Sequence, residues 1–318
     1  MQKPEIPVFF TIDDSYAPYL GVALTSMKEN ASHEYDYTII IVEQDLMEGN
    51  RKKLQKLNEP GFSIRFVRME PLAEKITDRE ENRLRCDYFT LTIYYRLFIA
   101  DMFPQYDKAI YLDSDVVIPG DISGLYRTDL KGCLIGACPD HSIADVPELV
   151  RYTEEAVGME KGKYINSGVL LLNLKKMREV KLADHFLRLL DQYHFDCIAP
   201  DQDYLNAMCQ GKILYLDRTW DAMPVKGRNP LKDPQIIHYN LFEKPWCYED
   251  VAYEDIFWQY ALKSAFYEEI RAAKENYSEE QRRSDSDCLK LLIKKACTIP
   301  ETETTFRKMK ESGVRIRL

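Results

Sequence analysis

The chain has 318 residues, of which 45% are hydrophobic and 30% are charged, the composition of a globular α/β protein with a substantial core and one or two domains. Its net charge of −9 argues against binding through a broad basic face, so we expect no nucleic-acid partner. No segment approaches about 18 consecutive apolar residues, and the apolar run at residues 8–12 is too short for a signal peptide.

The first third of the chain alternates strand and helix patterns. Short apolar runs predict strands, and longer segments with apolar residues three to four positions apart predict helices. We expect strands at Val8–Ile12, Tyr37–Val42, Ser63–Val67 and Ala109–Leu112, and helices at Tyr19–Lys28, Met47–Asn58 and Thr90–Ala100. Such an alternation is typical of a doubly wound sheet with helices on both faces.

The pattern continues less regularly towards the C-terminus. Further strands are expected at Leu134–Cys138, Gly168–Asn173 and Gln235–His238, and helices at Leu182–His194, Gln202–Met208 and Glu254–Ala273. Residues 217–234 are rich in Pro, Gly, Asp and Asn, which predicts a long surface loop. The very polar residues 275–287 are predicted to be a boundary.

We therefore predict one domain over residues 1–250 and a helical C-terminal extension over residues 251–318. Residues 282–318 carry 10 Lys and Arg against 5 Asp and Glu, a balance of +5, so the rest of the chain carries −14. A basic tail of this kind either makes a peripheral contact with an anionic membrane surface or stays solvated. Both readings remain open, as does the oligomeric state.

Eight cysteines are present, at positions 86, 133, 138, 197, 209, 247, 288 and 297, without a C-x-x-C pair or a repeated spacing. A disulfide framework is not expected at this length. The pattern favours buried free thiols, and with them a reducing, cytoplasmic location.

The segment Asp113-Ser114-Asp115 directly follows the predicted strand Ala109–Leu112. Residues two apart on a strand point to the same side, so the two carboxylates emerge together at the C-terminal end of the strand. Ligands of open α/β sheets bind at that end. Paired carboxylates there suit Mn²⁺ or Mg²⁺, and such an ion in turn neutralises a diphosphate.

Two other segments offer groups that complete such a site. His238 and Lys244, far along the chain, supply an imidazole and an ammonium. The first strand ends in Thr11-Ile12-Asp13-Asp14-Ser15-Tyr16, with neither G-x-G-x-x-G nor a P-loop, so glycine amides do not hold a phosphate there. A carboxylate and a tyrosine ring at this place suit a nucleotide base; alternatively, the aspartates only cap the next helix.

Six segments together resemble a known family: Asp13–Tyr16, Tyr95–Leu97, Tyr111–Asp115, Ile165–Leu170, Asp201–Asn206 and His238–Trp246. They stand in the order found in the retaining glycosyltransferase family 8, which includes bacterial lipopolysaccharide galactosyl- and glucosyltransferases and glycogenin. The resemblance covers residues 6–246, about three-quarters of the chain. It implies a mixed sheet of the GT-A type and transfer of a hexose, glucose or galactose, from a UDP-sugar to a glycan or glycolipid acceptor.

The resemblance also implies roles for individual residues. Asp113, Asp115 and His238 are similar to the metal ligands, and Lys244 to the residue that contacts the diphosphate. The nucleotide would be held by Thr11, Asp13, Ser15, Tyr16 and Ser114. The donor sugar would be held by Arg96, Asp140, Asn166, Asp201 and Gln202, of which Asp201 and Gln202 are the catalytic candidates.

Gln202 matches the residue that lies under the anomeric carbon. An amide is a weak nucleophile, which favours a same-face displacement in which the departing phosphate takes the proton of the acceptor. One position departs from the family: Leu241 stands where a glycine commonly follows the histidine by three residues. Since glycine lets the backbone approach phosphates closely, a leucine suggests a slightly different course for this loop.

Two other readings compete with a glycosyltransferase. The motif at Asp113 and Asp115 also fits a haloacid-dehalogenase-type phosphatase with Asp113 as nucleophile, but that fold normally opens with this strand. The third reading is a catalytically silent protein that binds a nucleotide sugar or glycan. Loss of an acidic ligand or of the distal histidine would indicate it, and all are present.

Overall fold

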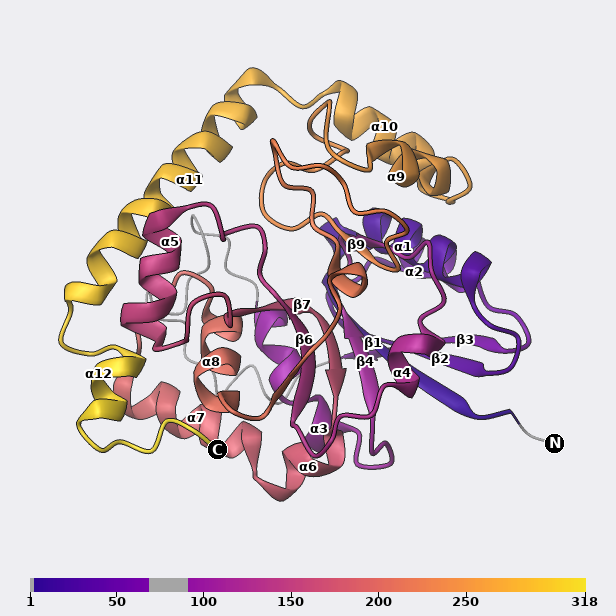
Figure 1. The fold of residues 1–318 in the computed structure, drawn as a ribbon. Coiled ribbons are helices and arrows are strands. Elements are labelled where there is room, and N and C mark those ends of the chain that lie inside the picture. The colour runs from indigo at the N-terminus through magenta and orange to yellow at the C-terminus, as the bar shows by residue number, and fades with distance from the viewer. Residues whose placement is uncertain (1–2, 69–90) are drawn as a thin grey trace.

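The computed structural model describes residues 3–68 and 91–318, and its centre is a mixed seven-stranded sheet of order β3-β2-β1-β4-β7-β6-β8 (Figure 1). The strands are β1 (Glu5–Asp13), β2 (Asp36–Gln44), β3 (Phe62–Arg68), β4 (Ala109–Leu112), β6 (Ile135–Pro139), β7 (Ile165–Leu172) and β8 (Ile213–Tyr215). Strands β3, β2, β1 and β4 are parallel, whereas β7 runs antiparallel to β4 and β6. A small second sheet pairs β5 (Val116–Val117) with β9 (Ile237–His238).

The central strands are apolar on both faces, as strands covered by helices on either side must be. In β1 every residue from Ile6 to Ile12 is buried. Successive residues point to opposite faces, so Phe9 and Tyr111 join one hydrophobic cluster while Val8 and Ile110 join another. The sheet therefore lies between two separate cores.

The helices form the outer layers. The α-helices are α1 (Ala17–Asn30), α2 (Glu48–Gln55), α3 (Ile99–Met102), α4 (Ser123–Arg127), α5 (Pro147–Tyr152), α6 (Leu174–Glu179), α7 (Leu182–Tyr193), α8 (Pro200–Cys209), α9 (Glu254–Ala261), α10 (Tyr267–Glu275), α11 (Glu279–Thr298) and α12 (Phe306–Glu311). The 3₁₀ segments are η1 (Asp14–Tyr16), η5 (Leu91–Leu97), η7 (Arg218–Asp221) and η8 (Ile299–Glu301), and η6 (Thr153–Val157) is a short π-helix.

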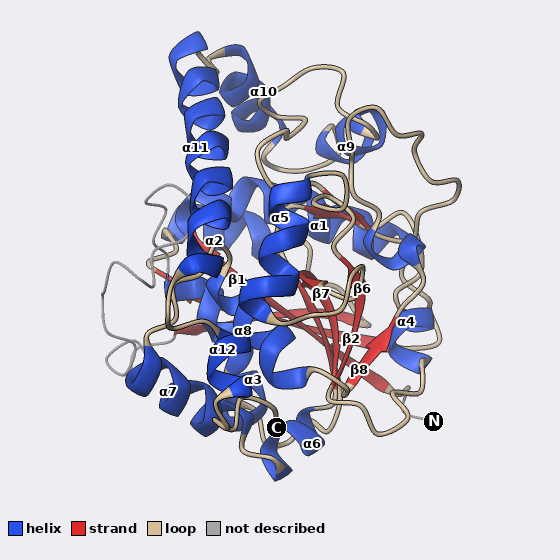
Figure 2. Ribbon diagram, turned by 60° about the vertical axis from the view of Figure 1, so that its left-hand side comes forward, coloured by secondary structure: helices blue, strands red, loops and turns tan. Residues whose placement is uncertain are grey.

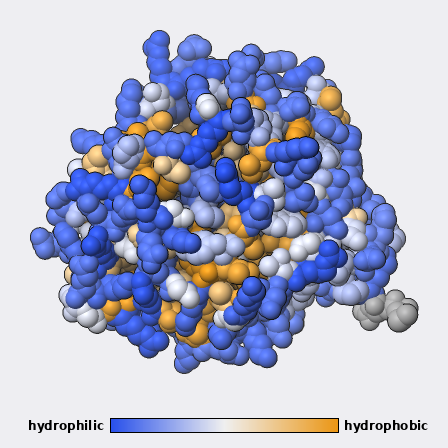
Figure 3. All heavy atoms as spheres, in the orientation of Figure 1, coloured by the Kyte–Doolittle hydropathy of each residue, from blue (hydrophilic) through white to orange (hydrophobic). Residues whose placement is uncertain are grey.

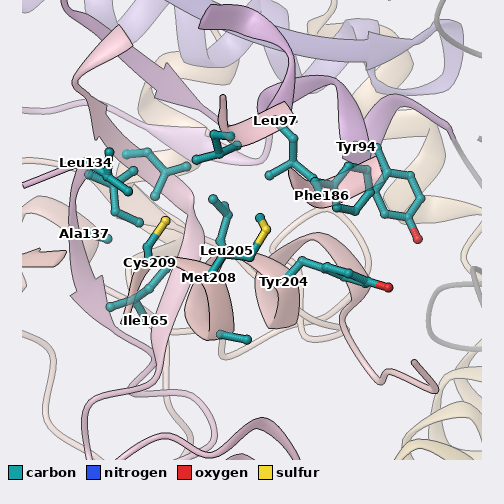
Figure 4. Packing of buried hydrophobic residues seen from close by; sticks show 14 of the residues in the cluster. Tyr94, Leu97, Leu134, Ala137, Ile165, Phe186, Tyr204, Leu205, Met208 and Cys209 are labelled. Carbon is teal, nitrogen blue, oxygen red and sulfur yellow. The ribbon is translucent and has the colours of Figure 1, made fainter. Parts of the chain in front are cut away.

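Each face of the sheet has its own set of helices (Figure 2). Helices α1, α9 and α10 contribute to the cluster that holds Val8, whereas α5, α7, α8, α11 and α12 contribute to the cluster that holds Phe9. In the second cluster, Leu205 and Met208 of α8 pack near Leu97 of η5 and Phe186 of α7 (Figure 4). Apolar residues show mainly towards the middle of the face seen in Figure 3, with hydrophilic residues around them.

The predicted fold class is confirmed: a doubly wound mixed sheet with helices on both faces and helices at the C-terminus. Every predicted strand overlaps an observed one, and the helices predicted at 19–28, 47–58, 182–194 and 202–208 overlap α1, α2, α7 and α8. The short strands β5 and β8 were not predicted. Among the described residues, no helix is both long and apolar enough to cross a membrane.

The helix predicted at Thr90–Ala100 is wrong in type. Thr90 lies outside the described residues, and the rest forms the 3₁₀ segment η5 followed by the short α3, with an i to i+3 bond from Phe98 N to Tyr95 O of 3.0 Å. Tyr94, Tyr95, Leu97 and Phe98 are all buried, so no face of the segment is free to be the polar face of an amphipathic helix. Tertiary packing overrides the periodicity.

The single helix predicted at Glu254–Ala273 is two helices. A turn at residues 262–266 separates α9 from α10 and drives Phe266 into the core against α1. A Cβ on Gly21 of α1 would lie 2.4 Å from the Phe266 ring, so the ring occupies the space that the missing side chain leaves. The break thus coincides with a contact to a residue far away in the sequence.

In the polar segment 275–287, predicted to be a boundary, α10 ends at Glu275 and the 20-residue helix α11 begins at Glu279. Ser278 and Gln281 form a capping box, and Arg282 lies 3.7 Å from Glu279 one turn away. Residues after 250 belong to both cores: Phe257 and Phe266 to one, Leu292 and Phe306 to the other. The division of the chain at residue 250 stays a prediction.

Candidate active site

Asp113, Asp115 and His238 lie together, although more than 120 residues separate the histidine from the aspartates. The loop after β4 carries both carboxylates, and β5 then pairs with β9 so that Val116 faces His238. A bond of 2.9 Å from Tyr239 N to Asp115 O fixes the register. His238 Nε2 lies 3.3 Å from Asp115 Oδ1 and 4.0 Å from Asp113 Oδ2.

Gly168 of β7 makes room for this cluster. Its carbonyl accepts a bond of 2.7 Å from Asp113 N, which brings the two strands into close contact. A Cβ at position 168 would lie 2.2 Å from His238 Cε1 and 2.8 Å from Asp113 Oδ2. A side chain at this place would therefore fill the space between the imidazole and the carboxylate.

The three ligand atoms lie within 4.8 Å of one another, which one divalent ion can bridge. Two carboxylate oxygens and an imidazole nitrogen are a donor set that suits Mn²⁺, with Mg²⁺ as the harder alternative. The site is only partly closed, since the Asp113 side chain is 28% exposed, so a bound ion would keep positions open to a diphosphate. The residues thus fit a catalytic divalent metal.

Asp221 lies behind His238 and is a residue that the sequence analysis missed. Its Oδ1 is 3.1 Å from His238 Nδ1, and its side chain is fully buried. With the Nδ1 proton directed at this carboxylate, Nε2 faces Asp113 and Asp115. The sequence carried no signal for it, because an aspartate in a segment rich in Pro and Gly most often caps a turn.

The charged groups in the cluster shift one another's pKa values. Burial lowers the pKa of His238, but Asp115 and Asp221 outweigh this and raise it to about 10 in the metal-free protein. Burial raises the pKa of Asp115, and Lys244 with His238 outweighs that and holds it well below its usual range. The Lys244 ammonium contacts Asp115 and also donates a bond of 2.6 Å to Tyr239 O.

Asp113 has partners of its own on the other side. Arg96 Nη2 donates to its Oδ1 at 2.8 Å, and the Tyr111 hydroxyl does so at 2.7 Å. Thr11 Oγ1 lies 2.9 Å from the same hydroxyl, which links β1 to this carboxylate through Tyr111. Burial lowers the pKa of Arg96, but Asp113 and Asp201 outweigh it and raise the pKa, so the guanidinium stays charged.

The residues predicted to hold the donor sugar form one buried hydrogen-bonded network. Arg96 Nη1 lies 3.2 Å from Asp201 Oδ2, and Ser167 Oγ donates to the same oxygen at 2.9 Å. Gln202 Oε1 accepts a bond of 3.0 Å from Ser167 N. The structure thus brings the start of α8 against the start of β7.

Asp140, at the end of β6, joins this network. Its Oδ2 accepts bonds from Gln202 Nε2 at 3.0 Å and from Asn166 Nδ2 at 3.2 Å. Its Oδ1 accepts one from Ser142 N at 3.0 Å. All of the predicted sugar-binding residues therefore lie in one place, linked through Ser167, which the sequence analysis did not single out.

Of the predicted nucleotide-binding residues, Thr11 and Asp13 lie at the end of β1, and Ser15 and Tyr16 lie in η1 directly after it. Asp13 Oδ1 accepts bonds from Ser15 N at 3.0 Å and Tyr16 N at 3.3 Å, so this carboxylate caps η1. Tyr16 is close enough to the metal-ligand cluster that burial, Asp115, Asp13 and Asp113 together raise its pKa. Ser114, between the two aspartates, is buried.

Comparison with known proteins identifies the family. The model of "Glycosyl transferase family 8" matches residues 7–250. The chain belongs to glycosyltransferase family 8. It is therefore an enzyme that transfers sugars, and the resemblance inferred from the six motifs is confirmed.

Relatives of this family 8 enzyme that are named as glycosyltransferases match about three-quarters of the chain. A lipopolysaccharide 1,2-glucosyltransferase of Escherichia coli K12 is 28% identical over 254 residues, covering 75% of this chain and 72% of that protein. A putative glycosyltransferase of Haemophilus influenzae is 28% identical over 247 residues, with coverages of 75% and 72%.

Solved structures of glycosyltransferases share the fold. The galactosyltransferase LgtC, in complex with donor and acceptor sugar analogs, matches with a TM-score of 0.68 and 26% identity, covering 88% of this chain and 100% of LgtC. The bifunctional glycosyltransferase WbbM matches in fold with a TM-score of 0.74 and 23% identity, and this chain spans 86% of its own length and 52% of WbbM. The predicted GT-A type of fold is confirmed, and neither the phosphatase nor the silent binding protein finds support.

Leu241, the departure from the family pattern, has a left-handed backbone with φ of 63°. A glycine takes this conformation readily, whereas another L-residue pays about 1 kcal/mol or more. The loop between His238 and Lys244 thus takes at this position the backbone conformation that glycine allows. The structure gives no sign that leucine turns the loop away from that conformation.

Proposed function

We propose that this family 8 enzyme is a metal-dependent retaining hexosyltransferase that moves glucose or galactose from a UDP-sugar to a glycan or glycolipid acceptor. One observation carries the proposal: Asp113, Asp115 and His238 present three ligand atoms within 4.8 Å, with the Lys244 ammonium beside them. Breaking a sugar–diphosphate bond leaves negative charge on the phosphates, and positive charge is needed there.

Asp113, Asp115 and His238 would hold Mn²⁺ or Mg²⁺. When bound, such an ion supplies positive charge to the diphosphate and lowers the free energy of its departure. Lys244 would leave Asp115 and contact the diphosphate as a point charge. Asp221 would keep His238 Nε2 directed at the ligand cluster, as its bond to Nδ1 supports.

The remaining residues would bind the rest of the donor. Asp13 would accept the uracil N3–H, Tyr16 would stack on the base, and Ser15 with the Thr11 backbone would complete the nucleotide site. Ser114 would lie next to the donor between the two metal-binding carboxylates. The network of Arg96, Asp140, Asn166 and Asp201 would bind the sugar hydroxyls, because it already holds these polar groups in fixed positions at the strand ends.

Gln202 would lie beneath the anomeric carbon, with Asp201 as its catalytic neighbour. Gln202 is held at both ends of its amide, by Ser167 N and by Asp140, which supports a role in orientation and charge stabilisation. In the reaction the C1–O bond to the diphosphate breaks, the acceptor oxygen bonds C1 on the same face, and the departing phosphate takes the acceptor proton. This scheme retains the configuration without a covalent enzyme intermediate.

The acceptor and the cellular location complete the proposal. The names of the relatives, a lipopolysaccharide 1,2-glucosyltransferase and LgtC, support a sugar acceptor and leave glucose and galactose both open. The seven described cysteines are free, which fits the reducing cytoplasm; Cys86 lies outside the described residues. A peripheral contact of the basic C-terminal residues with an anionic membrane remains part of the proposal.

The test is hydrolysis and transfer from UDP-glucose and UDP-galactose, with Mn²⁺ or with EDTA. We expect activity with one of the two donors, its loss in EDTA and its loss in Asp115→Asn. Asp129→Asn, an exposed aspartate outside the site, is the matched control and should be fully active. Full activity in EDTA, or an unaffected Asp115→Asn enzyme, would refute the metal-dependent mechanism.

A further inference from the structure

The C-terminal helix α11 reaches the loop that carries Lys244, although residues 251–318 lie outside the part matched by the family model. We propose that α11 positions this loop, with Asp285 acting through Tyr248 as a positioning residue for the diphosphate lysine. The proposal rests on the proposed role of Lys244 in donor binding.

The contact begins at Asp285 on the second turn of α11. Its Oδ2 accepts bonds of 2.6 Å from the hydroxyls of both Tyr248 and Tyr277. Arg282, one turn earlier, lies over the Tyr248 ring at 4.9 Å, and the Tyr277 ring meets that ring edge-on at 5.7 Å. Tyr248 is thus held by a carboxylate, a cation and a second ring, all from the C-terminal extension.

Tyr248 in turn holds the backbone of Lys244. The Lys244 carbonyl accepts a bond of 2.8 Å from Tyr248 N and one of 2.9 Å from Cys247 N. Between them, Trp246 is buried and stacks on Tyr19 of α1 at 4.1 Å. Tyr248 links the turn that begins at Lys244 to α11 by a hydrogen bond, and the neighbouring Cys247 also lies near Asp285 and Arg282 of this helix.

The far end of α11 is anchored on the other half of the site. Leu292 and Ala296 are buried in the same cluster as Leu149 and Tyr152 of α5, and α11 runs beside α5 in both Figures 1 and 2. The Tyr152 hydroxyl donates a bond of 2.8 Å to Asp203, the neighbour of Gln202. The helix therefore spans from the lysine loop to the wall that supports the sugar-binding network.

This arrangement favours donor binding by Lys244, whose ammonium lies at the end of a flexible four-carbon side chain. Its ammonium interacts as a point charge, so its contribution depends on where the backbone places the base of the side chain. Fixing that base before the donor arrives reduces the entropy that binding must remove. Loosening Tyr248 should then weaken donor binding and leave the step after binding nearly unchanged.

The first test uses UDP with Mn²⁺ as an equilibrium probe, measured by calorimetry. We expect Asp285→Ala to weaken UDP binding by about three- to tenfold and to raise the donor KM by a similar factor, with kcat changed less than about twofold. Asp287→Ala is the matched control, since Asp287 lies on the same helix, is exposed and pairs only locally with Lys290 at 2.8 Å. Asp287→Ala should leave UDP affinity, donor KM and kcat unchanged.

A double-mutant cycle separates positioning from general support of the fold. If Asp285 acts through Lys244, the Asp285→Ala effect on UDP affinity should nearly vanish in the Lys244→Ala background. An unchanged UDP affinity in folded Asp285→Ala, or an effect that adds fully to that of Lys244→Ala, would overturn the proposal.

Hydrogen exchange gives a readout that needs no ligand. The amides of residues 247 and 248 should exchange about three- to tenfold faster in Asp285→Ala than in Asp287→Ala. If the wild type fails to bind UDP, the proposed function fails, and the exchange rates still decide the role of α11. Equal exchange in the two variants would refute it.

Discussion

Asp221 is directed at His238 from the side opposite the two aspartates, with 3.1 Å between its Oδ1 and the imidazole Nδ1. Both residues are buried, and Asp221 comes from η7, in the segment that the sequence describes as a surface loop. The orientation of the histidine therefore depends on a carboxylate 17 residues earlier in the chain.

The first prediction concerns this pair. Asp221→Ala should weaken Mn²⁺ binding by about 10- to 100-fold, because the imidazole loses the partner that fixes its ring and tautomer. Asp221→Asn should lose less, since its amide oxygen can still accept the Nδ1 proton. Titration of free Mn²⁺ by electron paramagnetic resonance, without any donor present, measures both; equal affinity in wild type and Asp221→Ala would contradict the role.

The second prediction concerns Gly168. Gly168→Ala should weaken Mn²⁺ binding by more than about tenfold and lower the unfolding free energy by about 1–3 kcal/mol, because its Cβ would overlap the His238 ring. Gly136→Ala on the neighbouring strand is the matched control: its Cβ would meet only leucine side chains, at 3.3–3.4 Å. Chemical unfolding and Mn²⁺ titration should separate them, with only stability affected in Gly136→Ala. A normal Mn²⁺ affinity in Gly168→Ala would show that the ligands do not need this space.

The third prediction concerns Leu241. Leu241→Gly should leave the unfolding free energy unchanged or raise it by up to about 1 kcal/mol, because relief of the left-handed conformation opposes the greater entropy of the unfolded chain. Phe242→Gly, where φ is not positive, should only destabilise. Urea unfolding of the two variants is the measurement, and an equal loss of stability in both would mean that the conformation at Leu241 carries no strain.

The fourth prediction concerns the pH dependence of stability. Burial raises the pKa of Asp203 to about 6, against the bonds from Tyr164 and Tyr152 that lower it, whereas the unfolded chain has the ordinary value of 3.8. The folded state thus holds this proton more tightly, so the stability that Asp203 contributes is complete below about pH 4 and is lost as the pH rises through about 6.

The asparagine side chain in Asp203→Asn cannot ionise, so this variant should lack the pH-dependent contribution of Asp203 to the free energy of unfolding. Near pH 5 the unfolding free energy of the wild type should fall with pH more steeply than that of the variant, by about 1 kcal/mol per pH unit. Urea unfolding at intervals between pH 4 and 6.5 gives the two slopes. Parallel curves would place the pKa of Asp203 near its ordinary value.

The fifth prediction separates Gln202 from Lys244. Lys244→Ala removes a positive charge that attracts the diphosphate in the ground state and stabilises its larger negative charge in the transition state, so donor affinity and turnover should both fall. Gln202→Ala should lower kcat and kcat/KM together by about tenfold or more with little change in donor KM, because charge develops near C1 mainly in the transition state. Steady-state kinetics with the better UDP-sugar test this, after circular dichroism has shown that both variants fold. A rise in KM alone for Gln202→Ala would make it a binding residue.

The sequence by itself determined all the described strands except the short β5 and β8, and the edge of the sheet at which Asp113 and Asp115 lie. Apolar runs such as residues 8–12 and 109–112 must be buried on both faces, which specifies a sheet with helices on either side. The side-chain period of a strand brings Asp113 and Asp115 to the same edge, and the ordered motifs indicated the family.

The tertiary structure alone decided where long-range partners override local patterns. Asp221 lies in an apparent surface loop, and its role comes from its contact with His238. In the same way, η5 acts through the contact of Arg96 with Ser167, and α11 through the contact of Asp285 with Tyr248. None of these partners is a neighbour in the local sequence pattern. Local periodicity reports which side of an element is apolar, but it carries no information about which distant group a polar side chain will meet. Those pairings are selected only when the burial of the whole chain makes each unpaired polar group costly.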